Sequence, residues 1–284
     1  AKLPKIARRT GQSKEFVVPD SIEGWAKAAD VLLSSFFVGG GKHPEYEGRK
    51  VYFNLEKIRA KGAFISGGFK APGPNALRLA LDKIEALVKE EIKVGRDTLK
   101  PITAYDLTMF MADAVISGGV RRSATICLFS KDDHEMMTAK TGNWGVSNKQ
   151  RGRSNNSCVL LREDMSKAEL DTIMQSVKDM GEPGFILTSS LEALFNPCVE
   201  IGLQGYSVTK ESGFQFCNLT EINGAKSETP EIFYKQCKAA AVLGTIQATY
   251  TNFKFVSQVT KDITEREALI GVGITGWMNN PDVL

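Results

Sequence analysis

The sequence has few of the residues from which most metal sites are built. It has only two histidines, His43 and His134, and none of its five cysteines forms a C-x-x-C pair, so we expect no zinc site. No apolar run approaches the ~18 residues of a membrane-spanning helix, and the first residues have no signal-peptide pattern. The odd number of cysteines favours a reducing, cytoplasmic compartment.

The chain also has only a small excess of positive over negative charge. The 36 Lys and Arg residues and the 33 Asp and Glu residues give a formal net charge of +3. This is too small to predict a nucleic acid or a membrane surface as a partner. The 284 residues, 42% of them hydrophobic, are enough to bury a sizeable core. No linker, repeat or low-complexity segment divides the chain, so we predict a single region over residues 1–284.

Short apolar segments alternate with segments of helical periodicity. We expect strands at residues 51–53, 124–129, 156–161 and 185–187, and helices at 20–36, 74–92, 103–116, 166–180 and 229–250. Three pairs have the spacing of helix N-terminal caps, namely Asp20 with Glu23, Thr103 with Asp106, and Ser166 with Glu169. Strands that alternate with helices predict an α/β fold with parallel strands.

One stretch carries an unusual set of reactive side chains. Asn196, Cys198 and Glu200 occupy alternate positions, and in an extended segment alternate side chains share one face. An amide, a thiol and a carboxylate would then surround one small substrate. Pro197 has no N–H for a sheet ladder, which favours a loop or an isolated strand. The pattern alone leaves another interpretation open, because a cysteine among apolar neighbours is commonly a small buried hydrophobe.

Two glycine-rich segments invite interpretation as phosphate sites. The loop at residues 63–74 contains Gly67 and Gly68, and with Arg59 and Lys70 nearby it could hold an anion through backbone N–H groups. The spacing fits a plain surface turn equally well. Residues 271–276 match G-x-G-x-x-G by letter, but Pro281 interrupts the segment that follows, where the dinucleotide motif needs a helix. We therefore reject a dinucleotide site.

Several stretches in chain order resemble the catalytic subunit of ribonucleotide reductases. They are residues 20–21, 58–62, 67–68, 118–124, 155–157, 182–184, 196–201, 217–219 and 271–273. Residues 70–74 and 121–124 are most similar to the class II branch, which depends on adenosylcobalamin. The resemblance implies part of a ten-stranded α/β barrel, with a radical cysteine on a central finger loop.

The resemblance also implies a role for each residue of the unusual stretch. Cys198 matches the cysteine that becomes a thiyl radical and takes the 3′ hydrogen of the ribose. Glu200 matches the carboxylate that accepts the 3′-hydroxyl proton, and Asn196 matches the amide that binds the ribose hydroxyls. Cys217 matches one of the two cysteines that reduce C2′ and end as a disulfide.

A second site follows from the same resemblance. The residues that match the specificity site for a deoxynucleoside triphosphate effector are Asp20, Ser21, Arg59, Gly67 and Gly68, with Arg59 contacting phosphate. Those that match the loop linking effector to substrate choice are Gly118, Gly119, Arg121 and Arg122. Such a link between two sites would be allosteric.

The implied cofactor is adenosylcobalamin. The implied partners are a ribonucleoside di- or triphosphate substrate, a deoxynucleotide effector, a thioredoxin-type reductant, and either a second copy or complementary chain segments. The second reducing cysteine, the substrate phosphate loop and a C-terminal cysteine pair have no match, so we expect no turnover from the isolated chain. The spacing from Cys198 to Cys217 predicts an inserted hairpin near residues 204–212. Two alternatives stay open: a non-catalytic nucleotide-binding module, and a class I subunit with a metal-bearing partner.

Overall fold

The computed structural model describes residues 4–65, 68–117, 124–253 and 256–283. Contacts divide the chain into two compact units: unit 1 holds residues 1–191 and 196–199, and unit 2 holds residues 192–195 and 200–284. The region predicted over residues 1–284 therefore contains two compact units. Whether these units form one domain is not decided by this division, and the single domain stays a prediction. Within the described ranges, no helix is long and apolar enough to cross a membrane.

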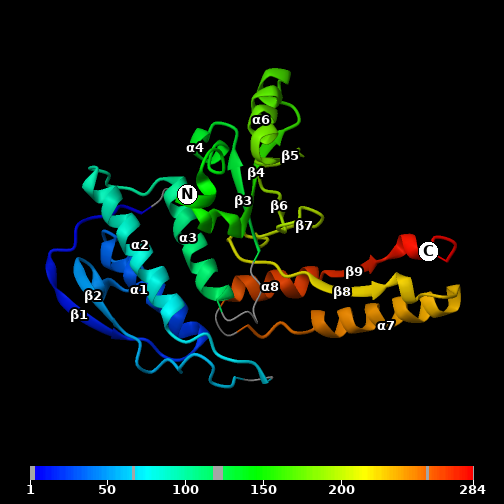
Figure 1. The fold of residues 1–284 in the computed structure, drawn as a ribbon, viewed down its shortest axis with the longest axis horizontal. Helices are drawn as coiled ribbons and strands as arrows, with labels where there is room; N and C mark the ends of the chain where they lie inside the picture. Colours follow the sequence, from blue (N-terminus) through cyan, green and yellow to red (C-terminus); the bar gives the residue numbers. More distant parts are fainter. Residues whose placement is uncertain (1–3, 66–67, 118–123, 254–255, 284) are drawn as a thin grey trace. The chain divides into compact units, whose positions relative to one another are not determined.

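Unit 1 begins with two parallel strands joined through a helix (Figure 1). Strand β1 (Gly11–Val17) pairs with β2 (Arg49–Asn54), and α1 (Ile22–Phe36) and the short η1 (Pro44–Tyr46) lie between them in the chain. Helix α1 packs against β2 and α2 (Asn75–Lys93). Helix α3 (Pro101–Ile116) packs against α2. Their apolar faces enclose a first core that includes Val18, Ala28, Leu32, Leu77, Ile84 and Val88.

Two predicted helix caps are wrong by a few residues. Helix α1 is capped by Ser21, whose hydroxyl accepts from the N–H of Gly24, and not by Asp20, whose carboxylate pairs with Arg59. Helix α3 begins at Pro101, ahead of the expected cap at Thr103. Thr103 and Asp106 instead lie inside α3 and are buried. In both places a long-range polar partner takes the side chain that local spacing assigns to a cap.

A three-stranded parallel sheet follows, in the order β3-β4-β5. Its strands are β3 (Thr125–Ser130), β4 (Ser154–Leu161) and β5 (Gly184–Thr188). Helix α6 (Lys167–Met180) starts with the predicted capping box of Ser166 and Glu169. Between β3 and β4 lie the short elements α4 (His134–Met137), α5 (Trp144–Ser147) and η3 (Lys149–Arg153). A second core includes Tyr105, Met109, Phe129, Cys158, Leu160 and Ile173.

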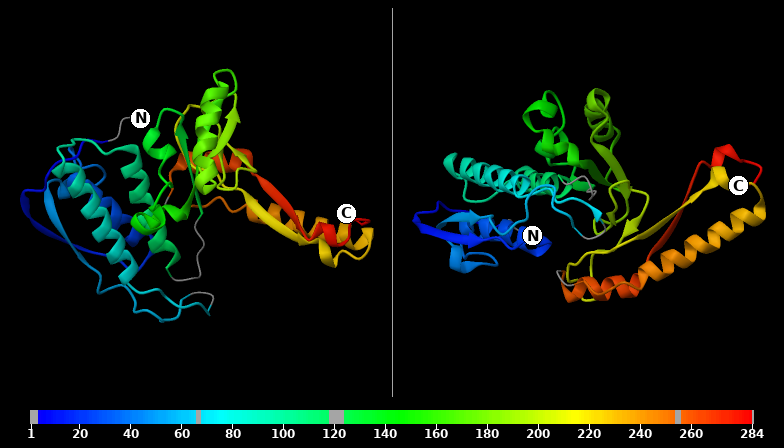
Figure 2. Two further views of the ribbon diagram at one scale, coloured as in Figure 1. Left: turned by 45° about the horizontal axis from the view of Figure 1, so that its top comes forward. Right: turned by 60° about the horizontal axis from the view of Figure 1, so that its bottom comes forward.

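Unit 2 is built around one long helix. Helix α7 (Pro230–Ala248), capped by Thr229, packs against the parallel strands β8 (Asn218–Asn223) and β9 (Ile270–Thr275), and Figure 2 shows the helix lying along both strands. Helix α8 (Gln258–Glu267) precedes β9. The remaining elements are β6 (Leu194–Phe195), β7 (Gly202–Leu203), η4 (Gly224–Lys226) and η5 (Trp277–Asn279).

The predicted α/β class is confirmed, since the sheets β1-β2, β3-β4-β5 and β8-β9 are all parallel. A hairpin is present at the predicted place: Tyr206 and Ser212 form an antiparallel bridge, and the N–H of Gly213 donates to the carbonyl of Gly205 at 2.8 Å. That this hairpin is an insertion stays a prediction. The ten-stranded barrel with its finger loop stays a prediction.

Candidate active site

Residues 196–201 connect β6 to β7, whose register pairs Phe195 with Gly202. The expected loop is confirmed, but the expected extended conformation is wrong. The N–H of Val199 donates to the carbonyl of Asn196 at 2.9 Å, which closes a four-residue turn. Pro197 causes this, because its ring fixes φ near the value that the second position of such a turn requires. Because the segment turns, Asn196, Cys198 and Glu200 do not share one face in the way that alternate residues of an extended strand do.

The turn presents the Cys198 thiol to solvent. Cys198 is exposed, so its interpretation as a small buried hydrophobe is wrong. Val199 has φ +70°, the left-handed region that a β-branched residue adopts only at a cost. A strained residue directly after an exposed cysteine indicates that the surroundings, not local preference, set this backbone.

A side chain of unit 1 holds the turn from outside. The amide of Asn155, on β4, donates to the carbonyl of Pro197 at 2.6 Å. The neighbours Asn156 and Ser157 are 2% and 5% exposed, which anchors this end of β4. Asn155 lies in one of the stretches that resemble the reductases, but the spacing predicts no role for it. The available signal was a run of three polar residues at the start of an apolar strand.

Glu200 and Cys217 both lie in unit 2, and they interact electrostatically. Burial raises the pKa of the Cys217 thiol, and the negative charge of Glu200 raises it further. Cys217 directly precedes β8, where the side-chain amide of Asn218 donates to the carbonyl of Leu269 at 3.0 Å. At neutral pH the cysteine is therefore held as the protonated thiol, the form that carries a hydrogen to deliver.

Replacing Glu200 with glutamine is expected to lower the pKa of Cys217, because one of the two effects that raise it disappears. The thiolate fraction at pH 8 then rises, and alkylation of Cys217 becomes faster. The rate is measured by mass spectrometry of the Cys217 peptide. Glu211→Gln is the matched control, since Glu211 is exposed and its carboxylate accepts from Thr209. Equal alkylation rates in the two variants would contradict the interaction.

The predicted effector residues are brought together in part. Nε of Arg59 lies 2.5 Å from Oδ2 of Asp20, and the Ser21 hydroxyl is occupied as the cap of α1. Gly68 has φ +79°, but its N–H donates to the carbonyl of Ile65 at 3.2 Å, so it turns the chain instead of facing an anion. The other predicted residues, Gly67, Gly118, Gly119, Arg121 and Arg122, lie outside the described residues.

The pair of Asp20 and Arg59 lies at the carboxyl ends of β1 and β2. Asp20 follows β1 and Arg59 follows β2, and ligands of open α/β sheets bind at the carboxyl ends of parallel strands. In the described part of the chain, no three His, Cys, Asp or Glu side chains gather in a metal-binding arrangement.

No family model matches the chain, but curated relatives do. It is 26% identical over 279 residues to the adenosylcobalamin-dependent ribonucleoside-triphosphate reductase of Lactobacillus leichmannii, covering 91% of this chain and 35% of the relative. The enzyme of that name from Lacticaseibacillus paracasei is 27% identical over 291 residues, 95% of this chain and 36% of the relative. A probable enzyme of this kind from Dictyostelium discoideum is 27% identical over 264 residues, 84% of this chain and 32% of the relative.

The resemblance to ribonucleotide reductases that the motifs predicted is thereby confirmed. Within that class, the similarity is to the adenosylcobalamin-dependent enzymes, as predicted. The chain spans about a third of the length of the curated relatives that it matches.

Proposed function

We propose that this chain is part of a ribonucleotide reductase that depends on adenosylcobalamin and reduces ribonucleoside triphosphates. The observation that carries the proposal is similarity over about nine-tenths of the chain to reductases of that cofactor and substrate. The exposed turn that carries Cys198 supports it, because a reactive thiol must be accessible to a cofactor and a substrate.

The residues present fit the cofactor's chemistry. Adenosylcobalamin, when bound, supplies the radical that removes the hydrogen atom from a thiol. Cys198 suits that role because it is exposed and the turn from Asn196 to Val199 fixes its backbone. Cys127 and Cys158 do not suit it, since Cys158 is fully buried and Cys127 is partly buried against the second core, where neither a cofactor nor a substrate can reach them.

The reaction then uses four side chains of this chain and one further cysteine. The Cys198 sulfur takes the C3′ hydrogen while Asn196 orients the ribose and Glu200 accepts the 3′-hydroxyl proton. The 2′-hydroxyl leaves as water. Cys217 and a second cysteine supply two electrons and end as a disulfide, and Cys198 returns the hydrogen to C3′. One substrate and two thiols thus give one deoxynucleotide, one water and one disulfide, which a thioredoxin-type protein reduces again.

The specificity site belongs to the same proposal. Asp20, Ser21, Arg59 and Gly67 bind a deoxynucleoside triphosphate, with Gly68 turning the loop beside them. The loop containing Gly118, Gly119, Arg121 and Arg122 transmits the effector's identity to the substrate site. The pairing of Asp20 with Arg59 at the carboxyl ends of β1 and β2 supports the first half of this assignment.

Assay of the protein in its full natural length tests the function. The expected result is deoxynucleotide formation from ribonucleoside triphosphates that requires adenosylcobalamin and a dithiol. Tight deoxynucleotide binding without tritium exchange at C3′ would favour the non-catalytic module instead. Activity that needs a metal-bearing partner and no adenosylcobalamin would favour the class I alternative.

Asn155→Ala is expected to lower kcat about tenfold with little change in KM, because a small misplacement of a reacting group is costly to the rate. The lost hydrogen bond to Pro197 is exposed, so the free energy of unfolding should change little. Asn155→Gln keeps an amide donor and should recover part of kcat. A fall in kcat that merely follows a loss of folded protein, measured by circular dichroism, would reject the positioning role.

A further inference from the structure

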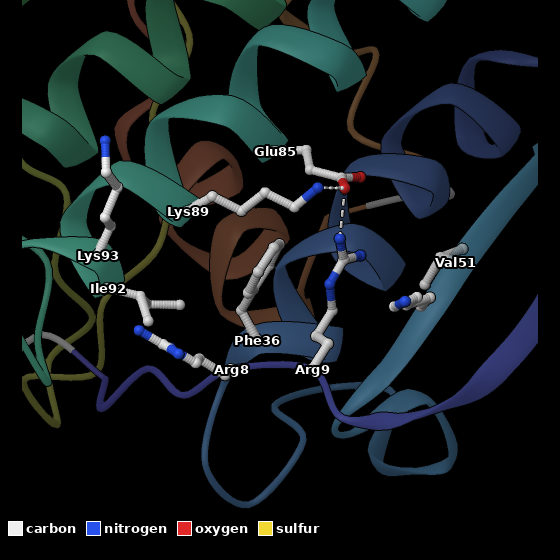
Figure 3. Close-up of a pocket in the computed structure, with 9 residues that line it drawn as sticks. Arg8, Arg9, Phe36, Val51, Glu85, Lys89, Ile92 and Lys93 are labelled. Atoms are coloured by element: carbon white, nitrogen blue, oxygen red, sulfur yellow. Dashed lines mark hydrogen bonds and ion pairs between the residues drawn. The ribbon is translucent and has the colours of Figure 1, made fainter.

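A pocket of about 420 Å³ opens between four segments of unit 1, one of which is the end of α1 with Phe36. Arg8 and Arg9 come from the segment before β1, Lys50 comes from β2, and Glu85, Lys89 and Lys93 come from α2. Figure 3 shows the Arg9 and Lys89 side chains converging on the Glu85 carboxylate. The volume lies within the range of about 300–1,000 Å³ that is typical of ligand sites.

Positive charge exceeds negative charge among the lining residues. Five cationic side chains surround one carboxylate. Glu85 accepts from Arg9 and lies 2.5 Å from Nζ of Lys89. Burial alone would raise the pKa of Glu85, but the hydrogen bonds and charges of Lys89 and Arg9 hold it below its ordinary value. The carboxylate is therefore ionised, and it offsets only one of the five cations.

Two of the cations have no acidic partner. Lys93 lies 3.3 Å from Glu90 in an exposed pair on α2. Arg8 and Lys50 form no ion pair with any residue that the structure describes, and both are exposed. They can turn toward an anion without first breaking a contact.

The floor of the pocket is rigid. The Arg9 side chain is 4% exposed, its guanidinium lies 4.1 Å from the centre of the Phe36 ring, and it donates to the Ser35 hydroxyl at 3.4 Å. A guanidinium held in this way loses little conformational entropy when it binds an anion. The pocket thus combines a fixed cation with exposed cations at its rim.

We propose that this pocket binds a di- or triphosphate anion. A single phosphate would satisfy fewer of the cations, whereas a polyphosphate can contact the fork of an arginine and the point charges of several lysines together. This site differs from the proposed effector site. Arg8 and Arg9 precede β1 and Lys50 lies at the start of β2, whereas Asp20 and Arg59 follow the other ends of these parallel strands.

Titration of the full-length protein with inorganic triphosphate tests the site. Lys50→Glu, alone and with Arg8→Glu, should raise the Kd for inorganic triphosphate at least about tenfold, because a cation is replaced by an anion at close range. Arg49→Glu makes the same charge change one residue earlier on β2, where the side chain points to the opposite face, and should leave the Kd within about twofold. Lys50→Gln, which adds no repulsion, should give an intermediate Kd.

Comparing ATP with inorganic triphosphate shows whether the bound anion is a nucleotide or a free polyphosphate. If ATP binds more tightly than inorganic triphosphate and is equally sensitive to Lys50→Glu, the anion belongs to a nucleotide; if ATP binds no more tightly, it is free polyphosphate. Equal Kd values in Lys50→Glu and Arg49→Glu, or no binding to the unaltered protein, overturn the proposal. Binding needs no turnover, so this result is independent of whether the chain belongs to a working reductase.

Discussion

Replacing Cys198 with alanine is expected to reduce deoxynucleotide formation to background. All five cysteines lie in the described part of the chain, and Cys198 is the one that is exposed. A methyl group cannot exchange a hydrogen atom with the ribose as a thiol does, so tritium exchange at C3′ should stop as well. The assay uses the full-length protein with adenosylcobalamin, a ribonucleoside triphosphate and a dithiol.

Cys237→Ala is the matched control for this prediction. Cys237 lies in α7 and is partly buried, and nothing assigns it a chemical step. Its loss should leave the rate within about twofold, because a small substitution at a partly buried position costs little. Wild-type deoxynucleotide formation by Cys198→Ala would refute the assignment of the radical cysteine. Loss of activity in both variants would point to damage by cysteine replacement in general.

The elements that local pattern decides could be predicted from the sequence. The strand near Asn156, the helix capped by Ser166 and the long helix after Thr229 all formed as expected, because periodicity and caps there agree with the tertiary packing. Asp20 and Thr103 failed as caps because their side chains have distant partners, Arg59 and Glu91.

In the candidate site, too, local sequence predicts some features and tertiary contacts decide the others. The reactive residues of the loop could be named from their spacing, but the turn at Pro197 removed the alternation on which their shared face depended. The basic pocket was not predicted at all. Its cations come from three segments, so that Arg9, Lys50 and Lys89 lie more than 30 residues from one another in the chain. Only the packing of α2 beside the strands brings them together.

A buried ion pair links α3 to the segment before β4. The guanidinium of Arg151 donates from Nε to Oδ1 of Asp106 at 2.9 Å and from Nη2 to Oδ2 at 2.7 Å. It also donates to the carbonyl of Ala139 at 2.7 Å, and Gln150 donates to Asp106 at 3.0 Å. The side chains of Arg151 and Asp106 are 12% and 7% exposed. Each charge therefore depends on the other for the solvation it has lost.

Asp106→Ala is expected to lower the free energy of unfolding of unit 1 by about 3–5 kcal/mol, because it leaves a buried guanidinium without its counter-charge. Urea unfolding followed by tryptophan fluorescence checks this, since the Trp144 ring lies beside Gly152, the residue that follows Arg151 in η3. Asp113→Ala is the matched control. Arg153 lies 2.7 Å from Asp113 with the two side chains 42% and 34% exposed, and losing an exposed pair costs only about 0–1 kcal/mol.

Replacing both partners separates the pair's own contribution from the cost of an orphaned charge. Asp106→Leu combined with Arg151→Met removes both charges and keeps apolar volume, so this double variant should be far more stable than Asp106→Ala. A double variant as unstable as the single one would mean that the hydrogen bonds to Gln150 and Ala139, not the charge pair, hold η3 against α3. An Asp106→Ala variant as stable as Asp113→Ala would mean that water reaches Arg151 when its partner is removed.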